Sequence, residues 1–356
     1  MIIKADGSTQ DSHLLSVCIP AYNRANLLPS LLDSIFSQDF DDFEVVIAED
    51  GSPERLAIRE VANDYAARYP GRLIYVENPE NLGYDGNLRN MFELAKGEYV
   101  FFMGNDDLMC LGALTKVADV VKRHPDVGVV LRTYAAFDDT PDNVVQTFRY
   151  FEREIFFPAG PDTISTIYRR SVVIPGMVIH REAALKLTTD RFDGILLYQL
   201  YLVAEILVEK NAVYLPDVTV LYRNGGTPDF GNSAAEQGKF VPKAQTPASS
   251  LYFVQGMLDI ARYVEQHRNI SIYKPILRDI ANYSYPLLSI QAQQPLKVFL
   301  GYGWSLSKMG FARYPLFWIY WVAILLLGAK RTDGLIRWIK RRLGRTPALG
   351  KVYQGT

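Results

Sequence analysis

The sequence is poor in several features that would place it in a familiar class of protein. Its 356 residues include only two cysteines, Cys18 and Cys110, which excludes a disulfide scaffold and favours a reducing compartment. The formal net charge of −1 argues against a general nucleic-acid binder. No repeat with a period of about 20 to 50 residues is apparent, so a solenoid is not expected.

Two common phosphate-binding motifs are also missing. No glycine-rich dinucleotide-binding turn follows the first predicted strand, and no Gly-Lys-Ser/Thr phosphate loop occurs in the chain. The absence of these motifs argues against a dinucleotide oxidoreductase and against a P-loop phosphotransferase. Residues 1–12 contain no long apolar region and carry acidic residues early, unlike a secretory signal, so the catalytic part is expected in the cytoplasm.

The most apolar stretch of the chain is short for a membrane span. Residues 314–329 form an uncharged run of 16 residues, whereas a transmembrane helix needs about 20. Residues 330–356 then carry eight basic side chains against one acid, Asp333. Aromatic residues followed by cations fit a helix that lies in, or dips into, an anionic bilayer surface on the cytoplasmic side of the inner (plasma) membrane. The alternative is a buried C-terminal helix with a solvated basic end.

The first half of the chain alternates between apolar runs and helical periodicity. Helical spacing is expected near residues 27–37, 53–69, 84–95 and 111–123. Five short apolar runs flank these helices, at residues 14–19, 43–48, 72–76, 98–103 and 127–131. This alternation predicts an α/β fold with a largely parallel sheet flanked by helices.

Unusual polar residues follow the predicted strands, in segments 20–24, 49–52, 77–83 and 104–107. Ligands of open α/β sheets bind beyond the carboxyl ends of the strands, so these segments are expected to form one site. Asp50 suits hydrogen bonds from a ribose or a base, and Tyr22 offers an aromatic face to a base. Asp106 and Asp107 suit a hard divalent cation. Taken singly, each of these residues is also typical of a turn, a helix cap or core packing.

Several segments resemble glycosyltransferase family 2, whose members have the GT-A fold. The matching pieces are VCIPAYNR at 17–24, VVIAEDGS at 45–52, NLG at 81–83, AKGEYVFFM at 95–103 and NDD at 105–107. Together they cover residues 14 to about 135 with the order and spacing of the family. The resemblance implies transfer of a sugar from a nucleotide-sugar donor (UDP-, CDP-, GDP- or dTDP-linked) to a hydroxyl, usually with inversion, using Mg2+ or Mn2+.

The resemblance also implies roles for individual residues. Asp106 would be the metal ligand of the family's Asp-x-Asp motif, and Asp107 would support it or touch the donor sugar. The nucleotide-sugar site that it implies consists of Pro20, Tyr22, Arg24, Asp50, Asn81, Asn87, Asn105, Asp106, Asp107 and Arg223. Within this set, Pro20, Tyr22 and Asp50 would line the nucleoside pocket.

The sequence departs from the family pattern at two places. Gly104 stands at the first position of Asp-x-Asp, so one contact is missing, which Asn105 would replace in part. Tyr198 and Gln199 stand where family members often carry an acidic pair that supplies the base, and glutamine cannot accept a proton. The nearest carboxylate, Asp193, is the first candidate base, followed by His180 and Asp190. A turn role for Asp193, or a mechanism without a protein base, stays open.

Residues 212–223 resemble the family's closing strand, which ends in Tyr-Arg, and this strand and the segment after it suggest further parts of the site. Arg223 is placed to hold a departing diphosphate, because a guanidinium pairs with two phosphate oxygens; a surface salt bridge is the alternative. Residues 224–250 are rich in Gly, Pro and Ser, and we interpret them as a flexible lid over the donor. The expected organisation is an N-terminal tail at 1–13, a GT-A catalytic domain at 14–223, the lid at 224–250, and a helical, membrane-associating C-terminal region at 251–356.

The sequence thus predicts a metal-dependent glycosyltransferase of surface polysaccharide biosynthesis that acts on a glycan or polyprenyl-linked acceptor at a membrane surface. Two other classes stay open. A sugar nucleotidyltransferase also builds a metal site on a parallel sheet, but its glycine-rich, lysine-containing loop is missing here. A non-catalytic scaffold that binds sugar nucleotides or membranes would explain the two departures from the family pattern.

Overall fold

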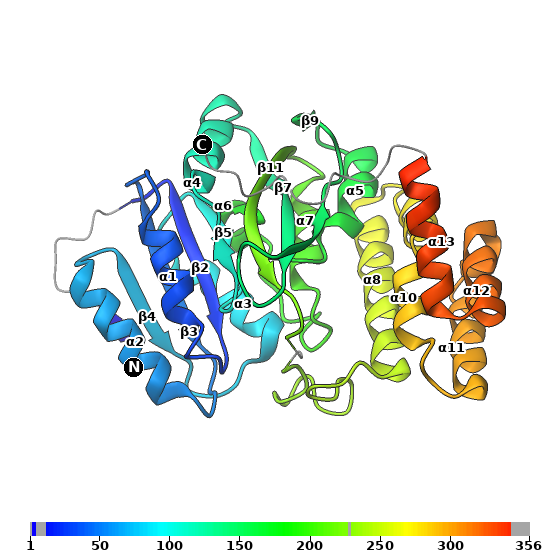
Figure 1. The fold of residues 1–356 in the computed structure, drawn as a ribbon. Helices are drawn as coiled ribbons and strands as arrows, with labels where there is room; N and C mark the ends of the chain where they lie inside the picture. Colours follow the sequence, from blue (N-terminus) through cyan, green and yellow to red (C-terminus); the bar gives the residue numbers. More distant parts are fainter. Residues whose placement is uncertain (1, 5–11, 227–228, 343–356) are drawn as a thin grey trace.

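A computed structural model describes residues 2–4, 12–226 and 229–342 of the chain, and Figure 1 shows its fold. A mixed sheet lies at the centre, with strand order β1-β4-β3-β2-β5-β10-β7-β11-β6; β8 pairs with β7 and β9 with β11. The strands are β1 Ile2–Lys4, β2 Leu15–Ala21, β3 Phe43–Glu49, β4 Leu73–Glu77, β5 Tyr99–Phe102, β6 Leu108–Met109, β7 Val127–Phe137, β8 Val144–Phe148, β9 Ile155–Phe157, β10 Val178–His180 and β11 Asn211–Arg223.

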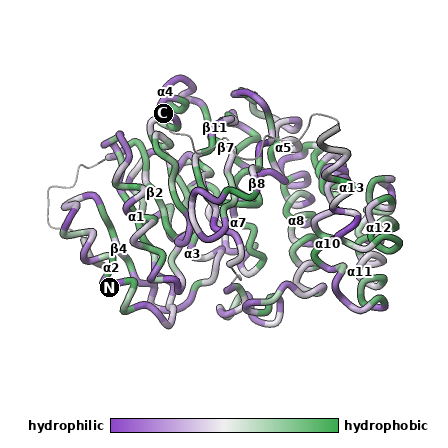
Figure 2. Tube along the Cα trace, viewed as in Figure 1, coloured by the Kyte–Doolittle hydropathy of each residue, from purple (hydrophilic) through white to green (hydrophobic). Residues whose placement is uncertain are grey.

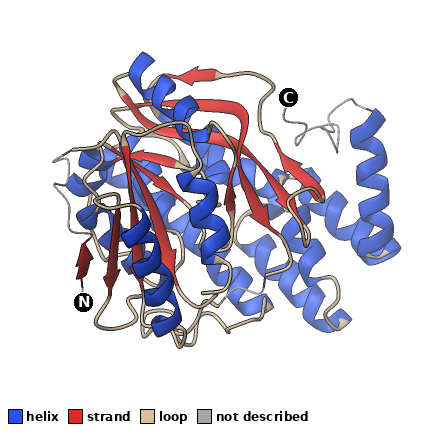
Figure 3. Ribbon diagram, turned by 60° about the vertical axis from the view of Figure 1, so that its left-hand side comes forward, coloured by secondary structure: helices blue, strands red, loops and turns tan. Residues whose placement is uncertain are grey.

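Helices cover both faces of the sheet and continue beyond it (Figures 1 and 3). Two short 3-10 turns, Tyr168–Ser171 and Phe311–Arg313, join some of them. The helices are α1 Leu28–Phe36, α2 Arg55–Arg68, α3 Gly83–Leu94, α4 Ala113–Arg123, α5 Pro161–Ile167, α6 Arg181–Lys186, α7 Tyr198–Ile206, α8 Pro247–Arg268, α9 Tyr273–Asn282, α10 Tyr285–Gln291, α11 Leu296–Lys308, α12 Pro315–Leu327 and α13 Ala329–Arg342.

The period-two alternation of the strands divides the core into two layers. On β2, Val17 and Ile19 pack with α1, α2 and α4 on one face, while Cys18 packs with α3 and α7 on the other. Because both faces are covered, β2, β3 and β4 are almost entirely apolar runs rather than alternating ones. The five apolar runs of the sequence therefore correspond to β2, β3, β4, β5 and β7.

The sheet is less parallel than the sequence suggested. Strands β2, β3, β4 and β5 are parallel to their neighbours in this group, but β10 lies antiparallel between β5 and β7. The cause lies in the path of the chain: it reaches β10 from Ile174 and Pro175, which lie at the carboxyl end of β5, and so must run back toward the start of that strand. This return brings Ile174 and Pro175 to the same edge as the polar loops.

The C-terminal helices pack as an extension of one layer. Helix α8 packs on α7, and α9, α11 and α12 continue the same hydrophobic cluster. Within the described residues, no helix is both long and apolar enough to cross a bilayer. Figure 2 shows α12 at the edge of the molecule away from most of the sheet, with mostly hydrophobic residues along its length. The predicted apolar segment 314–329 thus corresponds largely to α12.

Candidate active site

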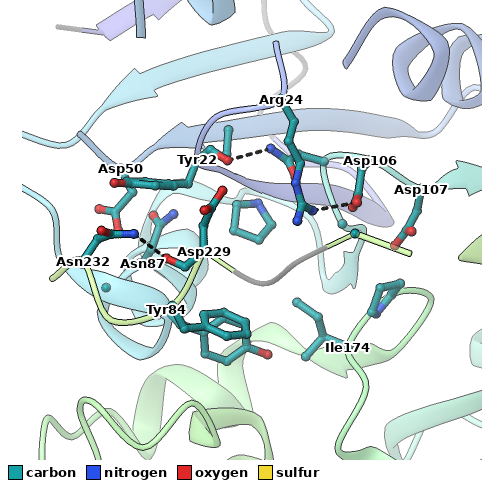
Figure 4. A pocket seen from close by; sticks show the side chains of 18 of the residues that line it. Tyr22, Arg24, Asp50, Tyr84, Asn87, Asp106, Asp107, Ile174, Asp229 and Asn232 are labelled. Atoms are coloured by element: carbon teal, nitrogen blue, oxygen red, sulfur yellow. Dashed lines mark hydrogen bonds and ion pairs between the residues drawn. The ribbon is translucent and has the colours of Figure 1, made fainter. Parts of the chain in front are cut away.

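One pocket opens at the carboxyl ends of β2, β3 and β5, as the positions of the polar loops predicted (Figure 4). Its cavity measures about 260 Å³. It is built by the strand-end loops, the start of α3, the segment before β10, the end of β11 and residues of the predicted lid. It is lined by Pro20, Ala21, Tyr22, Arg24, Asp50, Asn81, Gly83, Tyr84, Asn87, Gly104, Asn105, Asp106, Asp107, Ile174, Pro175, Tyr222, Gly226, Asp229, Phe230, Asn232 and Glu236.

Asp50 is held at one end of the pocket by hydrogen bonds to its carboxylate. Its Oδ1 accepts from the amide of Asn78 at 2.8 Å and from the backbone N–H of Leu82 at 2.9 Å. Asn78 also donates to Asn87, whose own amide donates to the carbonyl of Ala48 at 3.1 Å. Burial raises the pKa of Asp50 to about 6, although these hydrogen bonds lower it in part. The carboxylate is therefore fixed in orientation and able to accept a further hydrogen bond from a ligand.

Asp106 and Asp107 form a pair of adjacent buried carboxylates at the other end of the pocket (Figure 4). Asp106 Oδ2 accepts from the Arg24 guanidinium at 2.6 Å. Asp107 Oδ1 accepts from the backbone N–H of Arg223 at 3.0 Å, whereas its Oδ2 has no hydrogen bond to any described residue. Burial raises the pKa of both carboxyls, and the charge of Asp106 raises that of Asp107 further.

This carboxylate pair fits a divalent cation. Asp107 Oδ2 is a buried oxygen without a partner among the described residues, and oxygen ligands of this kind suit Mg2+ or Mn2+. Among the described residues, no group of three or more histidine, cysteine, aspartate or glutamate side chains is placed to hold a metal ion. Asn105 also lines this pocket. Its amide nitrogen donates to the carbonyls of Tyr22 and Asn23, so this nitrogen holds the loop after β2.

Residues 229–236 of the predicted lid lie against the start of α3. Glu236 accepts from the backbone N–H groups of Tyr84 at 2.7 Å and Gly231 at 2.8 Å, one on each carboxylate oxygen. The ring of Phe230 meets Tyr84 edge to face, with centroids 5.5 Å apart. Asp229 accepts from the side-chain amide of Asn23 at 3.3 Å. These contacts place a second set of polar and aromatic groups opposite the strand-end loops.

The candidate bases lie outside the pocket lining. Asp193 forms an ion pair with Arg89, and Asp190 is not among the lining residues. His180 caps α6 by accepting from the N–H of Ala183 at 3.2 Å, and its ring packs on Tyr99 at the opposite end of β5 from Asp106. The structure therefore does not bring these three residues to the site.

Arg223 and Gln199 also lie outside the pocket lining. Arg223 does not line the pocket; its Nε donates to the carbonyl of Asp106 at 3.0 Å and its guanidinium lies over Phe137. It supports the carboxylate pair from outside. Gln199 is buried and donates to the carbonyl of Val172 at 2.8 Å, close to Ile174 and Pro175. The other nine nucleotide-sugar residues named from the sequence all line the one pocket.

Sequence reasoning missed the pocket residues that no motif marks. Tyr84 lies in the first turn of α3, and Ile174, Asp229, Phe230 and Glu236 lie in loops whose course depends on tertiary packing. It also missed Asp85, a fully buried residue of α3. One of its carboxylate oxygens accepts three consecutive backbone N–H groups, at residues 194–196, and the other accepts from Tyr198. The available signal was an acidic residue, Asp85, in the first turn of a helix whose residues are mostly buried.

Solved structures with the same arrangement of elements are glycosyltransferases of the GT-A fold. The S. aureus TarS 1–349 structure in complex with UDP-GlcNAc matches with a TM-score of 0.57 and 17% identity, over 83% of this chain and 80% of that one. The structure of GalNAc-T7 with UDP, GalNAc and Mn2+ matches with a TM-score of 0.53 and 12% identity, over 81% and 59%. The present chain therefore has a GT-A fold.

The sequence also has relatives. Residues 16–185 match the family model described as glycosyl transferase family 2. An uncharacterized glycosyltransferase of Haemophilus influenzae is 25% identical over 178 residues, 49% of this chain and 55% of that protein.

A second relative is better characterised. The GalNAc(5)-diNAcBac-PP-undecaprenol beta-1,3-glucosyltransferase of Campylobacter jejuni is 34% identical over 104 residues, 28% of this chain and 32% of that protein. The chain thus spans about half the length of the first of these relatives and about a third of the second.

Proposed function

We propose that this protein transfers a sugar from a nucleoside diphosphate sugar to a hydroxyl of a glycan acceptor. The observation that carries the proposal is that Asp50 and the pair Asp106 and Asp107 line one pocket at the carboxyl ends of parallel strands. A nucleoside diphosphate has a hydrogen-bonding nucleoside at one end and anionic phosphates at the other. The pocket has a matching polarity, with Asp50 at one end and a candidate cation site at the other (Figure 4).

In this proposal, Asp50 accepts hydrogen bonds from the ribose or the base, and Tyr22 packs on the nucleoside. Asp106, with Asp107 beside it, would hold a Mg2+ or Mn2+ ion, which would supply the positive charge that a departing diphosphate needs. The fit of the carboxylate pair to such an ion supports this part, together with the Mn2+ in the GalNAc-T7 structure. Transfer with inversion, as in the family resemblance, places the acceptor on the far side of the sugar from the diphosphate.

The acceptor that we propose is a lipid-linked glycan at the cytoplasmic face of a membrane. Helix α12 supports this, because it is apolar on all sides yet buries only one face. Phe317, Trp321 and Ile324 pack inward, whereas Ile319 and Leu326 are 58% and 77% exposed. An exposed apolar helix face flanked by basic residues is typical of an interfacial helix. The lipid-linked acceptor named for the Campylobacter relative is consistent with it.

The donor activity is tested with a panel of UDP-, CDP-, GDP- and dTDP-sugars in the presence of Mn2+. Release of nucleoside diphosphate, even by slow hydrolysis without acceptor, supports a glycosyltransferase. Formation of pyrophosphate from a nucleoside triphosphate and a sugar 1-phosphate would instead support the nucleotidyltransferase. Binding of nucleotide sugars without turnover under any of these conditions would support the scaffold. Asp106→Asn is the negative control for metal-dependent release.

Membrane association is tested by sedimentation with vesicles of phosphatidylcholine and phosphatidylglycerol. We expect the double variant Ile319→Glu, Leu326→Glu to remain in the supernatant while the wild-type chain pellets. The matched control is Leu56→Glu, Leu111→Glu, because these leucines are 66% and 75% exposed on the catalytic domain. Equal sedimentation of all three proteins would contradict the membrane role of α12.

A further inference from the structure

We propose that Arg24 is the resident counter-cation of Asp106, that it competes with the divalent ion for this carboxylate, and that the donor diphosphate draws it away. The inference rests on the proposed function, because it requires that a nucleotide and a metal ion share this pocket. It assigns to Arg24 a role in coupling the binding of the nucleotide to the binding of the metal ion, beyond a simple contact to the donor.

The contact between the two residues is close and largely enclosed. Arg24 NH1 lies 2.6 Å from Asp106 Oδ2, and the side chains are 27% and 11% exposed. The backbone beneath Arg24 is fixed, because Asn105 donates to the carbonyl of Asn23 at 2.9 Å. Asn23 and Arg24 both adopt a left-handed conformation, with φ values of 54° and 63°, which turns the loop after β2 toward the carboxylate pair. Any change of partner by Arg24 would therefore involve its side chain rather than its backbone.

One guanidinium does not satisfy the charge of this site. Asp106 and Asp107 are consecutive buried carboxylates, and Asp107 Oδ2 has no partner among the described residues. A divalent ion held by this pair would offset both negative charges, whereas the single charge of Arg24 offsets that of Asp106 alone. The ion and the guanidinium repel each other at this range, so binding of the ion to Asp106 favours withdrawal of Arg24.

The donor offers Arg24 a second partner. Arg24 is the basic side chain that lines the pocket among the described residues, because Arg223 lies behind Asp106 and donates to its backbone carbonyl. A diphosphate in this pocket meets the Arg24 guanidinium, which pairs with two phosphate oxygens at once. Movement of Arg24 from Asp106 to the diphosphate frees the carboxylate for the metal. Nucleotide and metal binding then become positively coupled.

The test measures Mn2+ binding directly, by the electron paramagnetic resonance signal of free Mn2+, without substrate turnover. For the wild-type chain we expect weak binding of Mn2+ alone and tighter binding with the nucleoside diphosphate that the panel above identifies. In Arg24→Ala, binding of Mn2+ alone should strengthen about tenfold, and the effect of the nucleotide should shrink by the same factor, within the range usual for coupled sites. Direct binding of phosphate oxygens to Mn2+ raises the Mn2+ affinity equally in the wild type and in Arg24→Ala, so it does not affect the comparison.

Two variants serve as controls. Arg24→Lys keeps the competing charge, so its affinity for Mn2+ alone should stay near that of the wild type. Lys116→Ala removes one positive charge from an exposed pair with Asp217 elsewhere on the surface, and should change nothing. Arg24→Gln, which keeps most of the side-chain volume, repeats the test if Arg24→Ala melts at a lower temperature. This second variant separates the loss of charge from a loss of folded protein.

The outcomes distinguish the inference from the function on which it rests. If Arg24→Ala and Arg24→Gln bind Mn2+ as the wild type does, or more weakly, while nucleotide still binds, Arg24 does not compete and the inference is overturned. If the wild type binds nucleotide but no Mn2+ in its presence, the inference and the metal site both fall. If the wild type binds no nucleotide at all, the proposed function itself is overturned.

Discussion

Arg89 and Asp193 face each other in a two-pronged ion pair. NH1 of Arg89 lies 2.5 Å from Oδ1 of Asp193, and NH2 lies 2.7 Å from Oδ2. Arg89 belongs to α3, whereas Asp193 lies in the loop before α7, so the pair joins two elements that are distant in sequence. Both carboxylate oxygens accept from the guanidinium, so Asp193 is committed to this pair.

The first prediction follows from this pairing. Replacing Asp193 by Asn should leave turnover within a few-fold of the wild type, because a general base contributes on the order of 100-fold or more and this carboxylate is committed to Arg89. The same change should lower the free energy of unfolding by about 1–3 kcal/mol, since it removes a charge-assisted pair that is largely enclosed. Steady-state kinetics and chemical denaturation measure the two effects.

The double variant Arg89→Ala, Asp193→Asn completes the test of this pair. If the pairing is the main role of Asp193, the double variant should lose less stability than the sum of the two single variants. A loss of turnover of about 100-fold or more in Asp193→Asn, with the protein still folded, would restore Asp193 as the candidate base.

Asp229 gives the second prediction, because it is a carboxylate in the pocket that the lid supplies. Among the described residues, its carboxylate accepts from Asn23, whereas both oxygens of Glu236 are occupied by backbone N–H groups. Asp229→Asn should therefore change catalysis more than Asp193→Asn does. If Asp229 accepts the acceptor proton, kcat falls by about 100-fold or more at an unchanged KM for the donor. If it contacts the nucleoside, KM rises instead.

A result in which Asp229→Asn resembles the wild type in both kcat and KM would contradict either role. Asp217→Asn is a suitable control, because Asp217 is an exposed carboxylate paired with Lys116 away from the pocket. The comparison removes any general effect of losing one negative charge.

The residues that sequence reasoning placed correctly are those set by local chain geometry. Asp50 and Asp106 each follow a short buried strand, and parallel strands bring their carboxyl ends to one edge. An apolar run therefore predicts the strand, and the polar residues that follow the run are predicted to lie at the carboxyl-end edge of the sheet. The same logic located Tyr22 and Asn105.

The parts that the sequence did not specify depend on contacts between distant segments. The pairing of Asp193 with Arg89 joins residues more than 100 positions apart, and that of Glu236 with Tyr84 more than 150. Neither pair has a sequence spacing that marks it. The antiparallel direction of β10 likewise depends on where the preceding loop lies. This loop is at the carboxyl end of β5, a position that only the assembled sheet determines.

Gly83 supplies the third prediction, at the contact between α3 and the lid. Its φ is +75°, and a Cβ there would lie 2.4 Å from the hydroxyl of Ser233 and 2.8 Å from Glu236. Gly83→Ala should push these two residues away, open the lid side of the pocket and raise the KM for the donor. Gly71→Ala is the matched control, because Gly71 has a similar φ of +78° but nothing within 4 Å. Both variants introduce the same backbone strain. An increase in KM for Gly83→Ala but not for Gly71→Ala would therefore result from displacement of Ser233 and Glu236.

If both glycine variants raise KM equally, the strain of a left-handed alanine and not the displaced lid would be responsible. Thermal unfolding of both variants reports that strain, which we expect to be about 1–2 kcal/mol for each.

The last prediction concerns pH and the carboxyl of Asp50. Its pKa of about 6 in the ligand-free protein means that the carboxylate loses its charge as the pH falls through 6. A neutral carboxyl is a poorer acceptor for ribose or base hydrogens, so the affinity for the preferred nucleoside should fall between pH 7 and pH 5. The nucleoside without phosphate is the ligand to use, because phosphate groups titrate in this range. Asp50→Asn should bind weakly and without this pH dependence.

Protein stability should respond to the same group with the opposite sign. Burial raises the pKa of Asp50 above its value in the unfolded chain, so the folded state binds the proton more tightly between about pH 4 and pH 6. The free energy of unfolding of the wild type, measured relative to Asp50→Asn, should therefore fall as the pH rises through this window and level off above it. Urea denaturation at pH 4.5, 5.5 and 7 would measure this. A relative stability that rises with pH would show that Asp50 is stabilised as an anion before any ligand binds.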